Sequence, residues 1–196
     1  MVTASAVGAG SPRQHRQVRH LVVAGLSVSL MLIGCAAGVA SPPASAQRAQ
    51  RPLPAGRTPS GISKMVCARE AQREIAQTLG VRASVSRPTW VDHIYSCRYR
   101  YPDGGFVLTI KELSSWPQTL AYYSGIGRAQ GRTATVPNLG QGAFQTENGS
   151  AVVRKDWKVL TVDISGLPTQ FGKPPTSRGD VAVTVADVIL ACWAGD

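Results

Sequence analysis

The sequence predicts an α+β domain in which an antiparallel sheet of about five strands carries helices packed on one face. Three observations lead to this prediction. Apolar residues recur at helical spacing near both ends of the domain, alternating segments come in hairpin pairs between them, and turn-forming residues separate the strands. Mixed runs of helices and hairpins of this kind are typical of an antiparallel sheet with segregated helices.

Two segments in the first half of the domain predict helices. Residues 66–79 place alanine, isoleucine and leucine side chains at helical spacing, and Gly80 follows as a natural stop. Residues 116–129 form a weaker candidate, which has Pro117 in its first turn. The predicted hairpin lies between these two helices.

That hairpin is predicted from two alternating segments. Residues 91–101 have period two, with Tyr95 and Cys97 on the apolar face. Residues 102–105 supply turn chemistry, and residues 106–111 alternate again. The first helix is therefore followed by an antiparallel strand pair.

Three more strands are predicted after the second helix. Residues 143–146 lead into Asn148-Gly149, which is a strong signal for a short hairpin turn. Residues 150–155 and 157–164 continue the sheet.

A third helix is predicted to close the domain. Residues 181–192 carry its apolar stripe. Ser177, followed three residues later by Asp180, reads as a capping pair for its first turn.

The N-terminus has the pattern of an export signal. A basic segment ending at His20 leads into the uncharged run 21–40. Within this run, the four residues ending in Cys35 resemble the lipobox of bacterial lipoproteins, where cleavage before the cysteine leaves its thiol carrying diacylglycerol. We therefore predict a signal peptide over residues 1–34, a lipid on Cys35, and attachment to the extracytoplasmic face of the cell membrane.

Two other fates of the N-terminus stay open. Small residues ending at Ala46 also resemble a signal-peptidase site, and cleavage there would release a secreted protein. The run 21–40 is also just long enough to span a bilayer as an uncleaved anchor. All three alternatives place the domain outside the cytoplasm.

The chain after Cys35 divides into a tether and one domain. Residues 35–61 are rich in Ala, Pro, Ser and Arg and are predicted to form a flexible tether, whereas residues 62–196 form a single globular domain. The formal net charge of the whole chain is +10, but much of this excess lies before the domain. The mild charge of the domain and the export signal argue against a nucleic-acid partner.

The domain resembles small actinobacterial cell-envelope lipoproteins of unknown function, a family similar in build to the extracellular sensor domains of bacterial membrane kinases. The resemblance covers residues 65–193, contains no catalytic motif, and rests on Cys67, Leu79-Gly80, Cys97-Arg98-Tyr99, Asn138-Leu139-Gly140 with Ala143, and the closing helix.

The cysteines favour one disulfide. If Cys35 carries a lipid, Cys67, Cys97 and Cys192 remain, and one of them stays unpaired. We predict a Cys67–Cys97 bridge that staples the first helix to the sheet. A bridge that uses Cys192 and the absence of any bridge are the alternatives.

Catalytic and metal-binding signals are weak. His93 is the only histidine after the signal segment, which limits Ser-His and Cys-His chemistry. It is predicted to share a strand face with Tyr95 and Cys97, as a structural residue. No metal-ligand spacing is present, and no cofactor is predicted.

Aromatic residues are the candidate ligand-binding residues, because an aromatic cleft between helix and sheet would suit a lipid or a glycan. The candidates are Trp90, Trp116, Tyr122, Tyr123 and Trp157. Phe171 and Lys173, in the long loop 166–177, are candidates for contact with an envelope protein.

Together these features predict a membrane-tethered lipoprotein that acts as a non-enzymatic ligand-binding or accessory module of the cell envelope. An envelope hydrolase acting on lipid or glycan is one alternative, and a pocket that brings His93 to a serine or carboxylate would favour it. A structural protein-interaction domain without a pocket is the other, and an exposed apolar patch would favour that.

Overall fold

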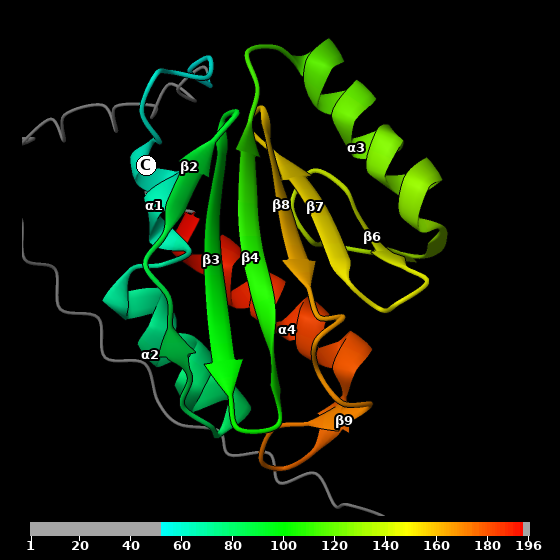
Figure 1. Ribbon diagram of the computed structural model, residues 1–196. Coiled ribbons are helices and arrows are strands. Elements are labelled where there is room, and N and C mark those ends of the chain that lie inside the picture. Colours follow the sequence, from blue (N-terminus) through cyan, green and yellow to red (C-terminus); the bar gives the residue numbers. More distant parts are fainter. Residues whose placement is uncertain (1–51, 194–196) are drawn as a thin grey trace, which may run out of the picture. The chain divides into compact units, whose positions relative to one another are not determined.

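The computed structural model describes residues 52–193, so the predicted signal peptide, Cys35 and most of the tether lie outside the described residues. In the described part, four helices surround an eight-stranded antiparallel sheet (Figure 1). The helices are α1 (Gly61–Met65), α2 (Arg69–Leu79), α3 (Trp116–Gln130) and α4 (Arg178–Cys192). The strands of this sheet are β1 (Ser84–Val85), β2 (Thr89–Val91), β3 (Ile94–Tyr101), β4 (Gly104–Glu112), β5 (Arg132–Val136), β6 (Ala143–Thr146), β7 (Ala151–Lys155) and β8 (Lys158–Asp163).

The α+β class is confirmed, but the sheet has more strands than the five expected. Its order is β1-β3-β4-β8-β7-β6-β5, and β2 also pairs with β3. The added strands are the short edge strands β1 and β2, together with β5, which pairs with β6. A separate two-stranded sheet, β9 (Gln170–Phe171) with β10 (Thr176–Ser177), lies in the loop before α4.

The prediction that the helices pack on one face is wrong for α3. Side chains of α2 and α4 share the main core with the face of the sheet that carries Leu108 and Leu160. On α3, Tyr123 packs instead against Phe144, Val152 and Val159, which belong to the opposite face. The strands under α3 are therefore buried on both faces, which explains their continuous apolar runs.

The predicted strand 91–101 is interrupted. Asp92 and His93 have φ values of 51° and 57° and form a two-residue turn between β2 and β3. Positive φ at both central residues is the geometry that matches the twist of a tight hairpin. His93 therefore lies in a turn, and the prediction that it shares a strand face with Tyr95 and Cys97 is wrong.

The predicted first helix is shorter than residues 66–79. Helix α2 begins at Arg69 and ends at Gly80, whose φ of 65° is the left-handed cap expected there. The residues before it form the short helix α1, with Val66 as its C-cap. Cys67 lies between the two helices and is bridged to Cys97 on β3, with a Cα–Cα distance of 5.7 Å. Cys192, on α4, has a free thiol and is half-buried.

The segment 52–60, predicted as part of the tether, contacts one end of the sheet. Ala55 N–H donates to the carbonyl of Leu113 at 3.2 Å, and Trp90 Nε1–H donates to the carbonyl of Arg57 at 3.0 Å. The ring of His93 hydrogen-bonds the carbonyl of Gly56 through Nδ1 at 3.0 Å. These bonds attach the segment across the end of β2, β3 and β4.

The predicted cap of the closing helix is present. Ser177 Oγ accepts a hydrogen bond from the N–H of Asp180 at 3.1 Å and donates to the Asp180 carboxylate at 2.7 Å. We expect Ser177→Ala to lower the free energy of unfolding by about 1 kcal/mol, because a first-turn N–H loses its acceptor. Urea denaturation measures this, with exposed Ser165→Ala as the control. An equal change in the two variants would contradict the capping role.

Candidate functional site

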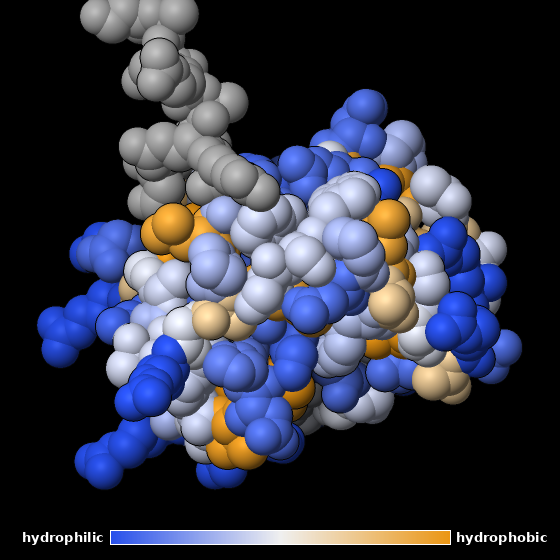
Figure 2. Space-filling model, turned by 90° about the horizontal axis from the view of Figure 1, so that it is seen from above, coloured by the Kyte–Doolittle hydropathy of each residue, from blue (hydrophilic) through white to orange (hydrophobic). Residues whose placement is uncertain are grey.

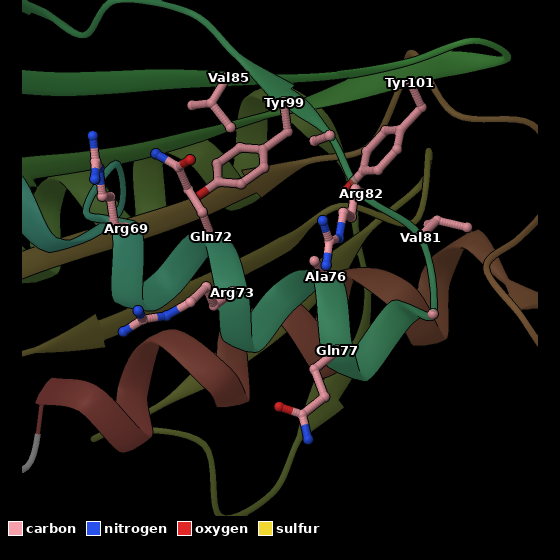
Figure 3. A pocket seen from close by; sticks show the side chains of 12 residues that line it. Arg69, Gln72, Arg73, Ala76, Gln77, Val81, Arg82, Val85, Tyr99 and Tyr101 are labelled. Atoms are coloured by element: carbon pink, nitrogen blue, oxygen red, sulfur yellow. The ribbon is translucent and has the colours of Figure 1, made fainter.

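A pocket of about 870 Å³ lies between α2 and the sheet edge formed by β1 and β3 (Figure 3). Helix α2 provides one wall, the segment from Gly80 to β1 provides a second, and two tyrosines of β3 complete the lining. The lining residues are Arg69, Gln72, Arg73, Ala76, Gln77, Gly80, Val81, Arg82, Ala83, Val85, Tyr99 and Tyr101.

The charge of this pocket is entirely basic. Arg69 and Arg73 lie on α2, Arg82 lies in the segment before β1, and no acidic residue lines the pocket. Arg73 is paired with Glu70 at 3.3 Å, but both side chains are largely exposed, so this pair contributes little stability. Arg69 and Arg82 form no ion pair within residues 52–193. Two guanidinium groups are therefore available for an anion.

The two tyrosines differ in their hydrogen bonding. Tyr99 is buried and its hydroxyl donates to the carbonyl of Val66 at 2.7 Å. The hydroxyl of Tyr101 is also buried, but it has no hydrogen-bond partner in the described residues. Burial raises the pKa of Tyr101 to about 12, so this hydroxyl keeps its proton at neutral pH and is a donor.

An unpartnered buried hydroxyl is costly, because it has lost its water without gaining another partner. Figure 3 shows the Tyr101 ring extending from β3 toward the side of the pocket that carries Arg82 and Val81. The pocket thus offers guanidinium groups and apolar surface from Val81, Ala83 and Val85, and the buried Tyr101 hydroxyl lies behind this surface, where a ligand reaches it once neighbouring side chains move. This combination suits a ligand with an anionic group attached to an apolar or flat group.

None of the five predicted aromatic residues lines this pocket. Trp116, Tyr122 and Tyr123 lie on α3, and Trp157 lies in the turn between β7 and β8. Trp90 lies on β2, which pairs with β3 along the same edge as β1 but at the other end of that strand. The structure brings Trp116 and Tyr123 together through Arg154, whose guanidinium carbon lies 4.7 Å and 5.6 Å from the two ring centroids. Trp90 is instead packed edge-on against His93 at 5.7 Å.

The two loop residues predicted to contact a partner differ in exposure. Phe171 is buried and packs edge-on against Tyr101 at 4.7 Å, where it supports the pocket from behind. Lys173 has an exposed side chain, while its backbone N–H donates to the carbonyl of Leu79 at 2.8 Å. The loop is therefore attached to the end of α2.

His93 has no catalytic partner among the described residues. The one hydrogen bond of its ring there is to the Gly56 carbonyl, so no serine or carboxylate in that part of the chain contacts the ring. Within residues 52–193, no three side chains of His, Cys, Asp or Glu gather into a possible metal site. No helix of the same residues has both the length and the apolar character needed to cross a bilayer.

Sequence reasoning missed the basic pocket. Arg69, Gln72, Arg73 and Ala76 have the spacing of one helical face, and this was the available signal. The other wall comes from Arg82 and β1, and only the pairing of β1 with β3 places that wall beside α2. A two-residue strand has no periodicity from which this pairing could be predicted.

Comparisons with protein-family models, with curated protein sequences and with solved structures found no match to this chain. The geometry of the pocket and the sequence are therefore the basis for a functional proposal.

Proposed function

We propose that this chain is a lipid-anchored extracytoplasmic lipoprotein whose domain is a non-enzymatic binding module of the cell envelope. The observation that carries the binding role is the basic pocket, in which Arg69 and Arg82 are free of ion pairs and the Tyr101 hydroxyl has no partner in the described residues. The ligand is an anion that carries an apolar group, as in a phospholipid or an acidic glycolipid.

The envelope location is supported by two independent features. The lipobox-like sequence ends at Cys35, and the domain has a disulfide, which persists in oxidising compartments outside the cytoplasm. Intact mass spectrometry of the protein from its native membrane tests the anchor. A diacylglycerol-modified N-terminus at Cys35 supports it, and a chain in the medium that begins after Ala46 contradicts it.

The binding role predicts an effect of arginine substitution. We expect the double variant Arg69→Gln/Arg82→Gln to bind dihexanoyl phosphatidylglycerol, kept below its micellar concentration, about 10–100-fold more weakly than the parent. Isothermal titration calorimetry measures the affinity. The matched control is the double variant Arg98→Gln/Arg128→Gln, since both arginines are exposed and neither lines the pocket.

Two outcomes would contradict this role. One is equal loss of affinity in Arg98→Gln/Arg128→Gln, which would indicate attraction by overall charge. The other is equal binding of the zwitterionic dihexanoyl phosphatidylcholine, which would leave the arginines without a function.

The unpartnered hydroxyl provides a second test with two readouts. We expect Tyr101→Phe to leave the free domain as stable or more stable, because it removes a buried donor without a partner. The same variant should bind the anionic lipid several-fold more weakly. Thermal unfolding measures the stability and calorimetry measures the affinity. A Tyr101→Phe variant that loses stability but keeps its affinity would contradict the role of the hydroxyl as a donor to the ligand.

A further inference from the structure

One end of the sheet combines the N-terminal segment of the described chain, two turns, a loop and the large exposed apolar side chains of residues 52–193. We call it the entry end, and define it by the segment 52–60, the turn Asp92-His93, the loop 113–115, the start of α3 and the turn Asp156-Trp157. These elements are neighbours, because Glu112 N–H donates to the His93 carbonyl and Leu113 N–H donates to the Trp157 carbonyl, each at 2.9 Å.

Large exposed apolar side chains are concentrated at this end. In residues 52–193 they are Leu53, Val91, Trp116 and Leu120, with exposed fractions of 79%, 64%, 37% and 37%. Leu53 is in the entry segment, Val91 precedes the β2–β3 turn, and the other two lie on the first turns of α3. Figure 2 looks onto this end and shows separate apolar patches among hydrophilic side chains.

The opposite end of the sheet has a different chemistry. It contains the β3–β4 turn with Asp103, the β6–β7 turn with Glu147 and Asn148, and the end of β8 at Asp163. None of the large exposed apolar residues of the described part lies there. The domain is therefore polar at one end and amphipathic at the other.

The charges at the entry end favour an anionic partner. Arg57, Lys111 and Lys155 contribute three positive charges, against the two carboxylates of Asp92 and Asp156. The Lys111 ammonium donates to the backbone carbonyl of Asp92 and also lies 5.7 Å from the centroid of the Tyr122 ring. Two more arginines, at positions 48 and 51, precede this end in the sequence.

We propose that the entry end rests on the anionic surface of the bilayer, with Trp116, Leu120, Val91 and Leu53 in the interfacial region. This inference rests on the proposed lipid anchor at Cys35. Residues 36–51 join that cysteine to the described chain, and even fully extended they reach at most about 60 Å. Tryptophan with neighbouring aliphatic and basic side chains is the composition that favours membrane interfaces.

This orientation keeps the basic pocket away from the lipid surface. The pocket is lined by α2, which begins after Cys67 at its bridge to Cys97 in the middle of β3, and by β1, whose Ser84 pairs with Arg100 near the far end of β3. The bilayer contact and the ligand site are therefore separate surfaces, and variants of one should leave the other unchanged.

The test uses the full-length mature protein in vesicles of equal parts phosphatidylglycerol and phosphatidylcholine, with lipids brominated near the top of the acyl chain. A bromine atom quenches the fluorescence of a tryptophan side chain only when the two are close together. We expect fluorescence quenching that is reduced in Trp116→Phe and in Leu120→Gln and unchanged in Trp193→Phe, with the remaining quenching coming from Trp90 and Trp157 at the same end. Trp193 is the control because it is buried, at 3% exposure.

Three results would overturn the inference. If the protein binds the vesicles but its tryptophan fluorescence is not quenched, the lipid anchor attaches the protein and the domain does not contact the bilayer. Quenching that is undiminished in both Trp116→Phe and Leu120→Gln would assign the contact to another face. If the protein forms a dimer in detergent in which Trp116 is buried, the entry end is an interface with a second copy of the chain. Absence of lipid on Cys35, measured by mass, is a separate failure and concerns the proposed anchor alone.

Discussion

Loss of the Cys67–Cys97 bridge is expected to lower the free energy of unfolding by about 3–4 kcal/mol. The bridge closes a loop with a sequence separation of 30, and opening it returns chain entropy to the unfolded state. It also joins the junction of α1 and α2 to the middle of β3, so its loss loosens the docking of both helices.

Urea denaturation of the double variant Cys67→Ala/Cys97→Ala measures this loss. The matched control is Cys192→Ala, which removes a half-buried free thiol and should cost about 1 kcal/mol. Adding a reductant should destabilise the parent protein and leave the double variant unchanged. A parent protein that is insensitive to reductant would contradict the structural role of the bridge.

Removal of the Glu112 carboxylate is expected to have an effect of similar size. This side chain is 5% exposed and accepts hydrogen bonds from the N–H of Ser60, at 2.8 Å, and from the hydroxyl of Ser63. Its cross-strand neighbour is Lys158, which is 6% exposed. Glu112→Ala would leave two donors without their acceptor and remove the negative charge that faces Lys158, at a cost of about 2–4 kcal/mol.

The same residue predicts a pH dependence. Burial alone raises the pKa of Glu112, but the hydrogen bonds from Ser63 and Ser60 and the charge of Lys158 hold it below its ordinary value of 4.5. Since the folded-state pKa is the lower one, its contribution to stability is present above about pH 4.5 and is lost as the pH falls through the folded pKa.

Glu112→Gln separates this effect from general acid unfolding. The glutamine keeps the shape of the side chain and does not titrate. We expect the stability difference between parent and variant to be constant near neutral pH and to shrink below about pH 4.5. Denaturation series at several pH values measure it, and a difference that grows on acidification would contradict the stated sign.

The elements that could be predicted are those with a long repeating pattern or a distinctive end. Residues 116–129 match α3 to within one residue, and Gly80 ends α2 as expected. The turn at Asp92-His93 was missed because it lacks the Asn-Gly or Asp-Gly signature, and its neighbours continue the alternation of β3.

The sequence did contain a signal that the sheet is covered on both faces. Val152 and Val153 are adjacent and both fully buried, which a strand with one solvent face does not allow. The pocket was beyond such reasoning, because Arg69 and Arg82 belong to different elements whose proximity is set by strand pairing at the sheet edge. The aromatic candidates were chosen by residue type alone, and type does not specify where a side chain lies.

The position of the disulfide also determines how the domain would respond to a mechanical pull. A force applied through the N-terminal segment first acts on the hydrogen bonds at Ala55, Gly56 and Arg57 and on the contact of Ser60 with Glu112. Beyond Val66 the load passes through a covalent bond into β3, which is paired with β4 along its whole length. The chain between Cys67 and Cys97, which contains α2 and most of the pocket lining, therefore cannot be extended while the entry segment is pulled away.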